Sequence, residues 1–472
     1  GTVSEAAFNS HFERGKLHRL DKSDRHNDFS MHIAGLQRFG RLNVSGMMSY
    51  TDTKEYNRRW NSTPYLTEKN PFVLCDSIAS DVTAEQFTMS AGASYRLNGA
   101  FTGALALRYL TGSSADQTDP RPRVNAMRFG LNPGGEFRIG QRQAVGISAD
   151  IEIFRSEITH AIVNPNNNYV YFLMKGMGDY QVRTNNDVTA YPRDYKGEKY
   201  KGAVQWLLNS SERISNILEI SFAASNEEAT DGGSTYTFKG GDYHHRKVAV
   251  YDRFSFGRGA SVRHNLGVNV AYTTDEGVWY DQKKRTDTEH GNLVYYEILN
   301  KSKIRKGGYW DVSASYRSDF FKDGLPDVTL QASAGLEKAD TKQYEVAVFR
   351  QKYQLVKLQV EGSKHWRTGR YRLQGLVSGL YVTNVGDKTF SSVKKNLSVT
   401  YSAPMFEYAS AGKCHVHAGF SVHSPVRIYN YGTWIGLYGN VSYSFYNDHS
   451  RYTDKYRSTS MMTVDVGVNL KF

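Results

Sequence analysis

Apolar and polar residues alternate with a period of two along most of the chain. The carboxy-terminal segment 461–472 shows the pattern most clearly: one parity is apolar from Met462 to Phe472, and the other, from Thr463 to Lys471, is not. Successive side chains of a β-strand point to opposite faces, so this alternation predicts strands with one apolar face. The other segments with this pattern are 42–50, 87–97, 101–109, 145–153, 218–222, 248–250, 266–272, 310–316, 328–336, 356–360, 371–381, 416–422 and 435–445.

The connections between the predicted strands are alternately short and long. Asn98-Gly99 is the strongest short-hairpin signal, because both positions of a two-residue hairpin turn favour positive φ. The other short connections are Phe39–Arg41, Gly140–Arg142, Asn209–Arg213, Gly257–Ala260, Lys322–Pro326, Thr368–Arg370 and Gly412–Lys413. The long ones are 54–81, 164–196, 229–243, 274–301, 383–392 and 447–457.

This layout is typical of an antiparallel up-and-down transmembrane β-barrel with short periplasmic turns and long extracellular loops. We expect an all-β chain with one barrel of about 14–16 strands over residues 26–472. The charged residues 1–25 are either an N-terminal extension or the first strand. A β-sandwich, the alternative, would have short turns at both ends more often.

Composition narrows the membrane class. A mean hydropathy of −0.56 comes with no apolar run long enough for a membrane helix. A barrel tolerates this low value because only every second residue of each strand faces lipid. The 33 Tyr and 23 Phe with only 10 Pro favour strands and interfacial girdles. Cys75 and Cys414 fit no ligand or redox spacing, so we expect both to be free.

The terminal TVDVGVNLKF, which ends on a Phe of the apolar face, is similar to the closing strand of bacterial outer-membrane barrels. With the alternating strands and tight turns, the chain resembles a poorly characterised family of Bacteroidota outer-membrane barrels that accompany TonB-dependent transporters and surface lipoproteins. The resemblance implies an outer-membrane location and contact with outer-membrane lipids. Residues 1–15 lack the apolar central region of a signal peptide, so we expect that a signal peptide was removed earlier. The chain is too short for the about twenty-two strands and plug of those transporters, which implies a companion barrel.

The polar parity of the strands predicts what lines the lumen. Its basic residues favour small anionic solutes if the bore is open, whereas the alternative is that charges pair across the barrel and fill it. The predicted lumenal basic residues are Arg96, Arg108, Lys247, Arg253, Arg263, Lys357, Arg372 and Lys413, with Lys471 at the last strand. The acidic residues of the same parity are Asp150, Glu152, Glu219, Asp311, Glu361 and Asp465. Although the net charge is +12, the basic residues are scattered and carry no nucleic-acid-binding signature, so no nucleic-acid partner is expected.

Three histidines form the sharpest local motif. His415, His417 and His423 share the parity of Lys413, and residues two apart on a strand are roughly 7 Å apart. They could hold a metal ion if a neighbouring strand supplied a third ligand. The alternative is that they are ordinary hydrogen-bonded lumenal histidines. No cofactor is expected.

Two functional hypotheses follow from these patterns. The first is a channel or accessory barrel in solute or nutrient uptake, favoured by the polar lumenal parity. The second is a non-conducting scaffold that anchors partner lipoproteins or a TonB-dependent transporter, favoured by long Tyr-, Asn- and Arg-rich loops such as Ile162–Asp194 and 431–434. A membrane-embedded hydrolase is a minor alternative: Ser421 lies beside the histidines, but no family signature supports catalysis, so we expect no enzymatic activity.

Overall fold

The computed structural model describes residues 2–60, 65–190, 192–211, 214–232, 237–257, 261–289, 291–345, 347–393, 397–428, 431–449 and 451–472. Eighteen long antiparallel strands form one closed ring in which each strand pairs with the next in the chain. The ring strands are β1 (Thr2–Gly15), β2 (Arg25–Phe39), β3 (Leu42–Arg58), β5 (Ser80–Arg96), β6 (Phe101–Asp116), β7 (Pro122–Ile139), β8 (Gln143–His160), β11 (Arg193–Ser211), β12 (Ile214–Gly232), β13 (Thr237–Phe256), β14 (Val262–Asp287), β15 (Leu293–Lys322), β16 (Leu325–Tyr344), β17 (Val348–Thr368), β18 (Tyr371–Asn384), β20 (Lys413–Ile428), β21 (Tyr431–Tyr446) and β22 (Ser460–Lys471).

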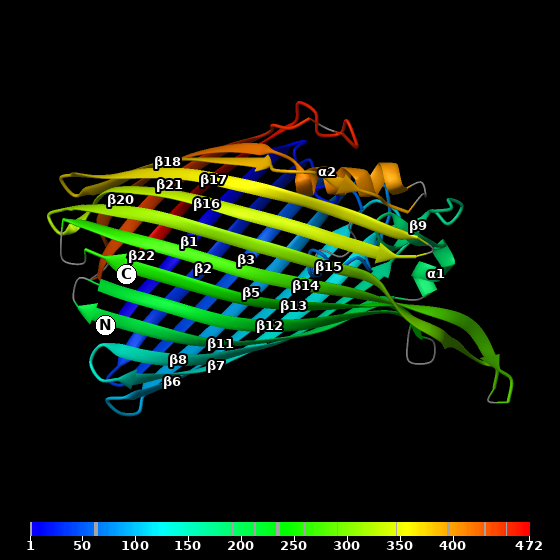
Figure 1. Cartoon of the computed structure of the whole chain (residues 1–472), viewed down its shortest axis with the longest axis horizontal. Coiled ribbons are helices and arrows are strands. Elements are labelled where there is room, and N and C mark those ends of the chain that lie inside the picture. Colours follow the sequence, from blue (N-terminus) through cyan, green and yellow to red (C-terminus); the bar gives the residue numbers. More distant parts are fainter. Residues whose placement is uncertain are drawn as a thin grey trace.

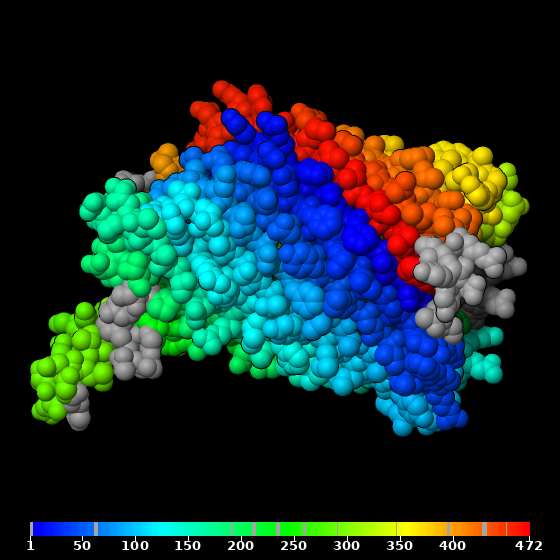
Figure 2. All heavy atoms as spheres, turned by 180° about the vertical axis from the view of Figure 1, so that it is seen from behind, coloured from blue at the N-terminus to red at the C-terminus, as the bar shows by residue number. Residues whose placement is uncertain are grey.

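The first and last strands close the ring. Phe8 of β1 stands opposite Val468 of β22, and the two strands pair antiparallel over most of their length. Figure 2 shows this seam as the red carboxy-terminal strand lying beside the blue amino-terminal one. Residues 1–25 were expected to be either an N-terminal extension or the first strand. Residues 2–15 form the first strand of the wall. The predicted all-β, antiparallel, up-and-down barrel is confirmed.

The predicted number of strands is wrong, because the barrel has eighteen rather than 14–16. The alternating pattern does not identify β1, whose outward parity is interrupted by Ser10 between Phe8 and Phe12. It also does not identify β11, because its first half carries charged residues on both parities and only its second half, around Val204 and Trp206, has an exposed apolar face.

The outward face of the barrel is apolar and exposed. Ile147, Val360 and Val377 are 64%, 66% and 62% exposed, and the large apolar side chains of most other strands share this parity. In water such a surface would cost roughly 25 cal/mol for each Å². Among the described residues, no helix is both long and apolar enough to cross a membrane.

The two ends of the barrel differ. The tight turns and both chain termini lie together at one end, here called the short-turn end (Figure 1). One such turn, between β5 and β6, stands where Asn98-Gly99 predicted it, but neither residue takes a positive φ. Instead the Asn98 side-chain oxygen accepts hydrogen bonds from the backbone N–H groups of Ala100 and Phe101, which makes an Asx turn. The predicted turns 209–213 and 257–260 lie partly outside the described residues.

At the opposite, long-connection end several predicted connections are wrong, and the predicted loop 229–243 is strand at 229–232 and 237–243. The predicted loop 274–301 is mostly strand. β14 and β15 stay paired from Val262–Phe320 at one end to Asp287–Leu293 at the other, and they project beyond the barrel as a long hairpin (Figure 1). The predicted turn at 412–413 does not join two strands, because β18 and β20 are connected by the whole of 385–412. This connection contains β19 (Thr389–Phe390), a π-helix (Ser398–Ser402) and α2 (Ala403–Ser410).

Five connections pack together at this end and form what we call the cap. The cap comprises the described residues of 16–24, 59–79, 161–192, 385–412 and 447–459. It contains β4 (Leu74–Cys75), β9 (Tyr171–Gly176), β10 (Asp179–Arg183), α1 (Asn185–Ala190) and α2, and β10, β9 and β4 form a separate three-stranded sheet. Buried apolar clusters join these elements to the inner wall, so the hydrophobic core lies in the cap.

Candidate functional site: a capped cationic chamber

One cap segment, residues 65–75, crosses the bore. It leaves β3 and returns to β5, but its contacts are on the far wall. β15 stands nine places from β3 in the eighteen-strand ring, and the Lys69 ammonium lies 3.3 Å from the ring centroid of Tyr309 on β15. Phe72 stacks on Trp279 of β14 with ring centroids 6.1 Å apart. We call residues 65–75 the crossing segment.

Two buried side chains of the wall hold the crossing segment. The Glu227 carboxylate of β12 accepts hydrogen bonds from the backbone N–H of Thr67 at 3.2 Å, from the Thr67 hydroxyl and from the Asn70 side-chain amide at 2.7 Å. The Tyr195 hydroxyl of β11 donates to the carbonyl of Phe72 at 2.9 Å and accepts from the backbone N–H of Leu74 at 3.3 Å. Hydrogen bonds to a charged acceptor are about twice as strong as neutral ones, so Glu227 is the stronger anchor.

Apolar packing adds to these anchors. Phe72 is fully buried in a cluster with Leu173, Phe238, Tyr243, Trp279 and Ile304. Burying a side chain of this size stabilises the closed arrangement by about 1.5–3 kcal/mol. On its other side the segment pairs with β9, where Leu74 stands opposite Leu173. The crossing segment is thus sandwiched between the wall and the rest of the cap.

A chamber of about 860 Å³ lies between the cap and the wall. The chamber is lined by Lys69 of the crossing segment, Tyr408 of α2 and Arg19 of the cap. Residues of seven wall strands complete the lining. The wall residues that carry charge or hydroxyl groups are Lys247, Thr273, Arg305, Tyr309, Asp311, Glu337, Thr341, Tyr353, Lys357 and Lys413. A volume of this size suits a small organic solute.

Cations outnumber carboxylates in this lining. Arg19, Lys69, Lys247, Arg305, Lys357 and Lys413 face three carboxylates, Glu68, Asp311 and Glu337. Three of the cations have acidic partners: Arg19 binds Glu68 at 2.5 Å, Lys357 binds Glu337 at 2.6 Å, and Arg305 lies 3.7 Å from the buried Asp275.

The other three cations, all lysines, have no carboxylate within ion-pair distance in the part of the chain that the structure describes. The Lys69 ammonium lies over Tyr309, and burial lowers the pKa of this cap lysine below its ordinary value. Lys413 donates to the carbonyl of Tyr408 at 2.5 Å and lies 3.5 Å from the centroid of that ring. Ring faces offset part of the cost of burying an ammonium group, but they supply no countercharge.

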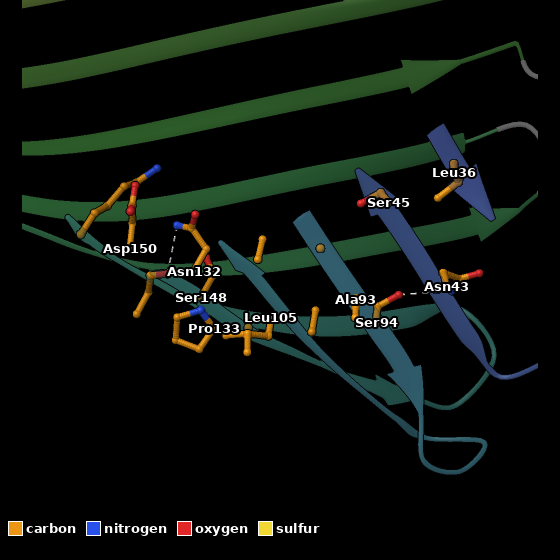
Figure 3. A pocket seen from close by; sticks show the side chains of 16 residues that line it. Leu36, Asn43, Ser45, Ala93, Ser94, Leu105, Asn132, Pro133, Ser148 and Asp150 are labelled. Atoms are coloured by element: carbon orange, nitrogen blue, oxygen red, sulfur yellow. Dashed lines mark hydrogen bonds between the residues drawn. The ribbon is translucent and has the colours of Figure 1, made fainter. Parts of the chain in front are cut away.

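The lumenal wall is hollowed toward the short-turn end. Small side chains of β3, β5, β6, β7 and β8 surround a hollow of about 440 Å³, with Asn43, Ser94, Asn132 and Ser148 on its wall (Figure 3). The Asn43 amide donates to the Ser94 hydroxyl at 3.2 Å, and the Asn132 amide donates to the Ala149 carbonyl at 3.4 Å.

A protein-family model matches the sequence of this chain over residues 1–472. The chain belongs to DUF6850, a family of unknown function. No curated protein matches it.

Several solved structures are similar to this DUF6850 barrel. The copper transporter OprC is 8% identical, with a TM-score of 0.42 over 99% of this chain and 80% of that one. The outer membrane transporter YddB from Escherichia coli is 10% identical, with a TM-score of 0.42 over 99% and 80%. The RagAB peptide importer is 6% identical, with a TM-score of 0.41 over 100% and 86%.

Three of the predicted lumenal basic residues, Lys247, Lys357 and Lys413, meet in the chamber of this family member. The other six are spread along the wall, and among them Lys471 lies 4.0 Å from the Glu5 carboxylate. Arg108 pairs with Asp150 at 2.8 Å, whereas Arg263 lies over the ring of Phe321 at 4.9 Å and Arg372 over that of Trp434 at 4.1 Å. The remaining two, Arg96 and Arg253, lie outside the chamber lining. The expected basic lumen therefore describes the chamber, whereas the Arg108–Asp150 pair joins strands two apart in the ring rather than opposite sides of the barrel.

The structure does not assemble a metal site around the three histidines. His415 lies 2.8 Å from the hydroxyl of Ser444, as expected for a hydrogen-bonded lumenal histidine. Across the described ranges, no group of three or more His, Cys, Asp or Glu side chains is arranged to hold a metal ion. His417 and His423 therefore lack the third ligand that the hypothesis required.

The sequence pattern did not identify Lys69, Arg305 or Arg19 as chamber residues. Lys69 and Arg19 lie in connections without a period, and Arg305 lies in the part of β15 that was expected to border a loop. One signal was available in the run Pro71-Phe-Val-Leu-Cys75, an apolar stretch inside a polar loop. Such a stretch indicates a loop that folds back into the protein, because an apolar run exposed to water is unfavourable.

Proposed function

We propose that the chain is an outer-membrane barrel for solute uptake whose bore is gated by the crossing segment. The apolar outward face supports the membrane location, because a closed barrel satisfies its backbone hydrogen bonds within lipid. Termini and short turns then lie on the periplasmic side and the cap on the extracellular side. The observation that carries the proposal is the crossing segment itself, which separates the cap side from a chamber and hollow below it.

Gating follows from how the crossing segment is held. It is held by hydrogen bonds to Glu227, Tyr195 and Arg128, by the Phe72 cluster and by pairing with β9, and its free Cys75 forms no disulfide to the wall. A closed state held by a few such contacts can open without unfolding the barrel, whose strands are paired around the whole ring. Movement of the segment would join the extracellular side to the chamber.

The test is conductance in planar bilayers. We expect the natural chain to be closed most of the time, and a Glu227→Gln, Tyr195→Phe double variant to open far more often. Glu228→Gln is the matched control, because Glu228 is the next residue of β12, binds Lys239 and does not contact the segment. A double variant that exposes Cys75 to thiol reagents yet conducts no better than the natural chain would overturn the proposal.

A second candidate function is a scaffold for a partner lipoprotein or transporter. The long β14–β15 hairpin favours it, because it projects beyond the barrel and exposes Leu293, Tyr295, Ile298 and Leu299. Exposed apolar side chains clustered on a projection are typical of protein contacts. Purification from native membranes in mild detergent tests this candidate: a partner that is retained by the full chain and lost on hairpin truncation supports it, and a lone monomer argues against it.

A further inference from the structure

The three unpaired lysines line one chamber from separate parts of the chain, and Lys413 stands six strands from Lys247 in the ring. Lys69 comes from the crossing segment, Lys247 from β13 and Lys413 from β20. The strand register fixes two of these spacings. Lys247 stands opposite Thr273, which stands opposite Tyr309, and the ammonium of Lys69 lies over Tyr309. Two strand spacings amount to about 10 Å.

The same register places Lys413 beside the paired lysine. Lys357 stands opposite Val382, and Val382 stands opposite Lys413, so these two lysines occupy one row with a single strand between them. The Lys357 ammonium is bound to Glu337, which also accepts a hydrogen bond from the Tyr353 hydroxyl at 3.1 Å. Glu337 is thus shared among donors and leaves Lys413 without its own countercharge.

Lys247 is the least satisfied of the three. Its side chain, which is exposed to the lumen, makes no hydrogen bond, ion pair or ring contact with any other residue that the structure describes. Of the chamber carboxylates, Asp311 stands opposite Ala271, two residues along β14 from Thr273. Asp311 accepts a hydrogen bond from Asn269 at 3.3 Å. Unpaired ammonium groups facing one cavity repel each other, and an anion bound between them would remove that repulsion.

We propose that the chamber is a binding site for a compact organic polyanion, one carrying two or more phosphate, sulfate or carboxylate groups, held by Lys69 and Lys247, with Lys413 adding positive charge at the far side of the chamber. This inference rests on the proposed uptake function and names its class of solute. A monovalent anion would meet one ammonium group at a time, whereas a polyanion can bridge the wall and the crossing segment. Because Lys69 belongs to the crossing segment, the bound solute also contacts the gate.

Isothermal titration of the full chain in detergent tests the site with inorganic pyrophosphate and citrate as probes, at fixed ionic strength. We expect at least one probe to bind, and the pair of probes distinguishes a phosphate from a carboxylate preference. Each lost charge-assisted contact costs about tenfold in affinity, so Lys247→Gln should weaken binding about tenfold. The triple variant Lys69→Gln, Lys247→Gln, Lys413→Gln should show no measurable binding.

Lys201→Gln is the matched control, because Lys201 faces the lumen outside the chamber and already pairs with Glu219 at 3.4 Å. It should bind the probe as the natural chain does. Lys247→Gln is the decisive variant, since a side chain without contacts can be changed without disturbing the fold. Binding of neither probe, or equal binding by the natural chain and by Lys247→Gln, would overturn the inference.

The two proposals fail separately. Titration needs neither a membrane nor an open gate, so anion binding without conductance by the gate variant would overturn the uptake function alone. Conductance by the gate variant without anion binding would overturn the polyanion site alone.

Discussion

Glu227 is the residue on which closure of the bore depends most. Its carboxylate, only 7% exposed, accepts all three hydrogen bonds that the crossing segment makes to β12. Glu227→Gln keeps the shape but turns an amide N–H₂ toward a donor of the segment. Leaving buried donors unsatisfied costs about 1–3 kcal/mol.

We therefore expect Glu227→Gln to speed the labelling of Cys75 by about tenfold to a hundredfold. Cys75 lies in the crossing segment, is fully buried, and its thiol pKa is raised by burial, so a maleimide reaches it only when the segment opens. A Cys414→Ala background removes the other thiol. Unchanged labelling in Glu227→Gln, relative to Glu228→Gln, would mean that Glu227 does not hold the segment.

Asp76, just past the crossing segment, makes closure pH-dependent. Burial, with a smaller contribution from the nearby Asp116, raises the pKa of its carboxyl to about 6. The open segment returns Asp76 to its ordinary pKa of 3.8. Closure is therefore favoured fully below about pH 4, weakens as the pH rises toward 6, and carries the whole penalty above 6. The difference between 3.8 and about 6 corresponds to about 3 kcal/mol.

Asp76→Asn should remove this penalty, because the amide stays neutral and its oxygen can still accept from the backbone N–H of Ile78. Cys75 labelling should be slower in the variant than in the natural chain at pH 7, and equal at pH 4. Taking the ratio at each pH cancels the thiol's own titration. A ratio that does not change with pH would contradict a raised pKa of Asp76 in the closed state.

At the residue scale, the alternating pattern could assign faces but not neighbours. It placed Lys247, Lys357 and Lys413 on the lumenal parity, where the structure also has them. Their convergence depends on the register around the ring and on the path of the crossing segment. Neither can be derived from parity alone, because a register is set by pairings between strands that are far apart in the sequence.

At the element scale, long strands were predictable and the cap was not. Strands that cross lipid repeat the alternation over many residues, whereas β4, β9 and α2 are too short to show a period. Their structure comes from packing, as when Trp60 contacts Phe172 and Tyr401 with ring centroids 5.6 Å and 5.3 Å apart. The β14–β15 hairpin was missed for another reason: above the membrane both faces of a strand meet water, so the apolar parity disappears.

That hairpin should be dispensable for the barrel. Replacing residues 285–295 with Asn-Gly closes the strands at the Lys284–Tyr296 pair and keeps Tyr296, which packs on Phe238 with ring centroids 5.1 Å apart. We expect the free energy of unfolding to change by less than about 0.5 kcal/mol, because the removed residues lie outside the wall. Urea unfolding in lipid vesicles measures it, and a large loss would show that the hairpin supports the cap.

At the scale of the whole molecule, the apolar side chains lie in two places, the outward face of the wall and the buried clusters of the cap. The wall turns its apolar side chains outward, so it provides little core of its own, and the cap gathers the buried apolar clusters inside one end. Backbone pairing around the ring and packing of the cap are therefore separate sources of stability. This separation allows the cap, or one segment of it, to move while the ring stays closed.

Whether the crossing segment moves alone can be decided by a cross-link within the cap. Cys75 of β4 stands opposite Phe172 of β9, and residues so paired have Cβ atoms about 4.5–5.5 Å apart, near enough for a disulfide after a small shift. Phe172→Cys in the Glu227→Gln, Tyr195→Phe, Cys414→Ala background should conduct when reduced and close when oxidised, because the disulfide ties the segment to β9. Phe172→Ser in the same background should conduct under both conditions. A verified disulfide that leaves conductance unchanged would mean that the cap opens as one body, with β9 carried along with the crossing segment.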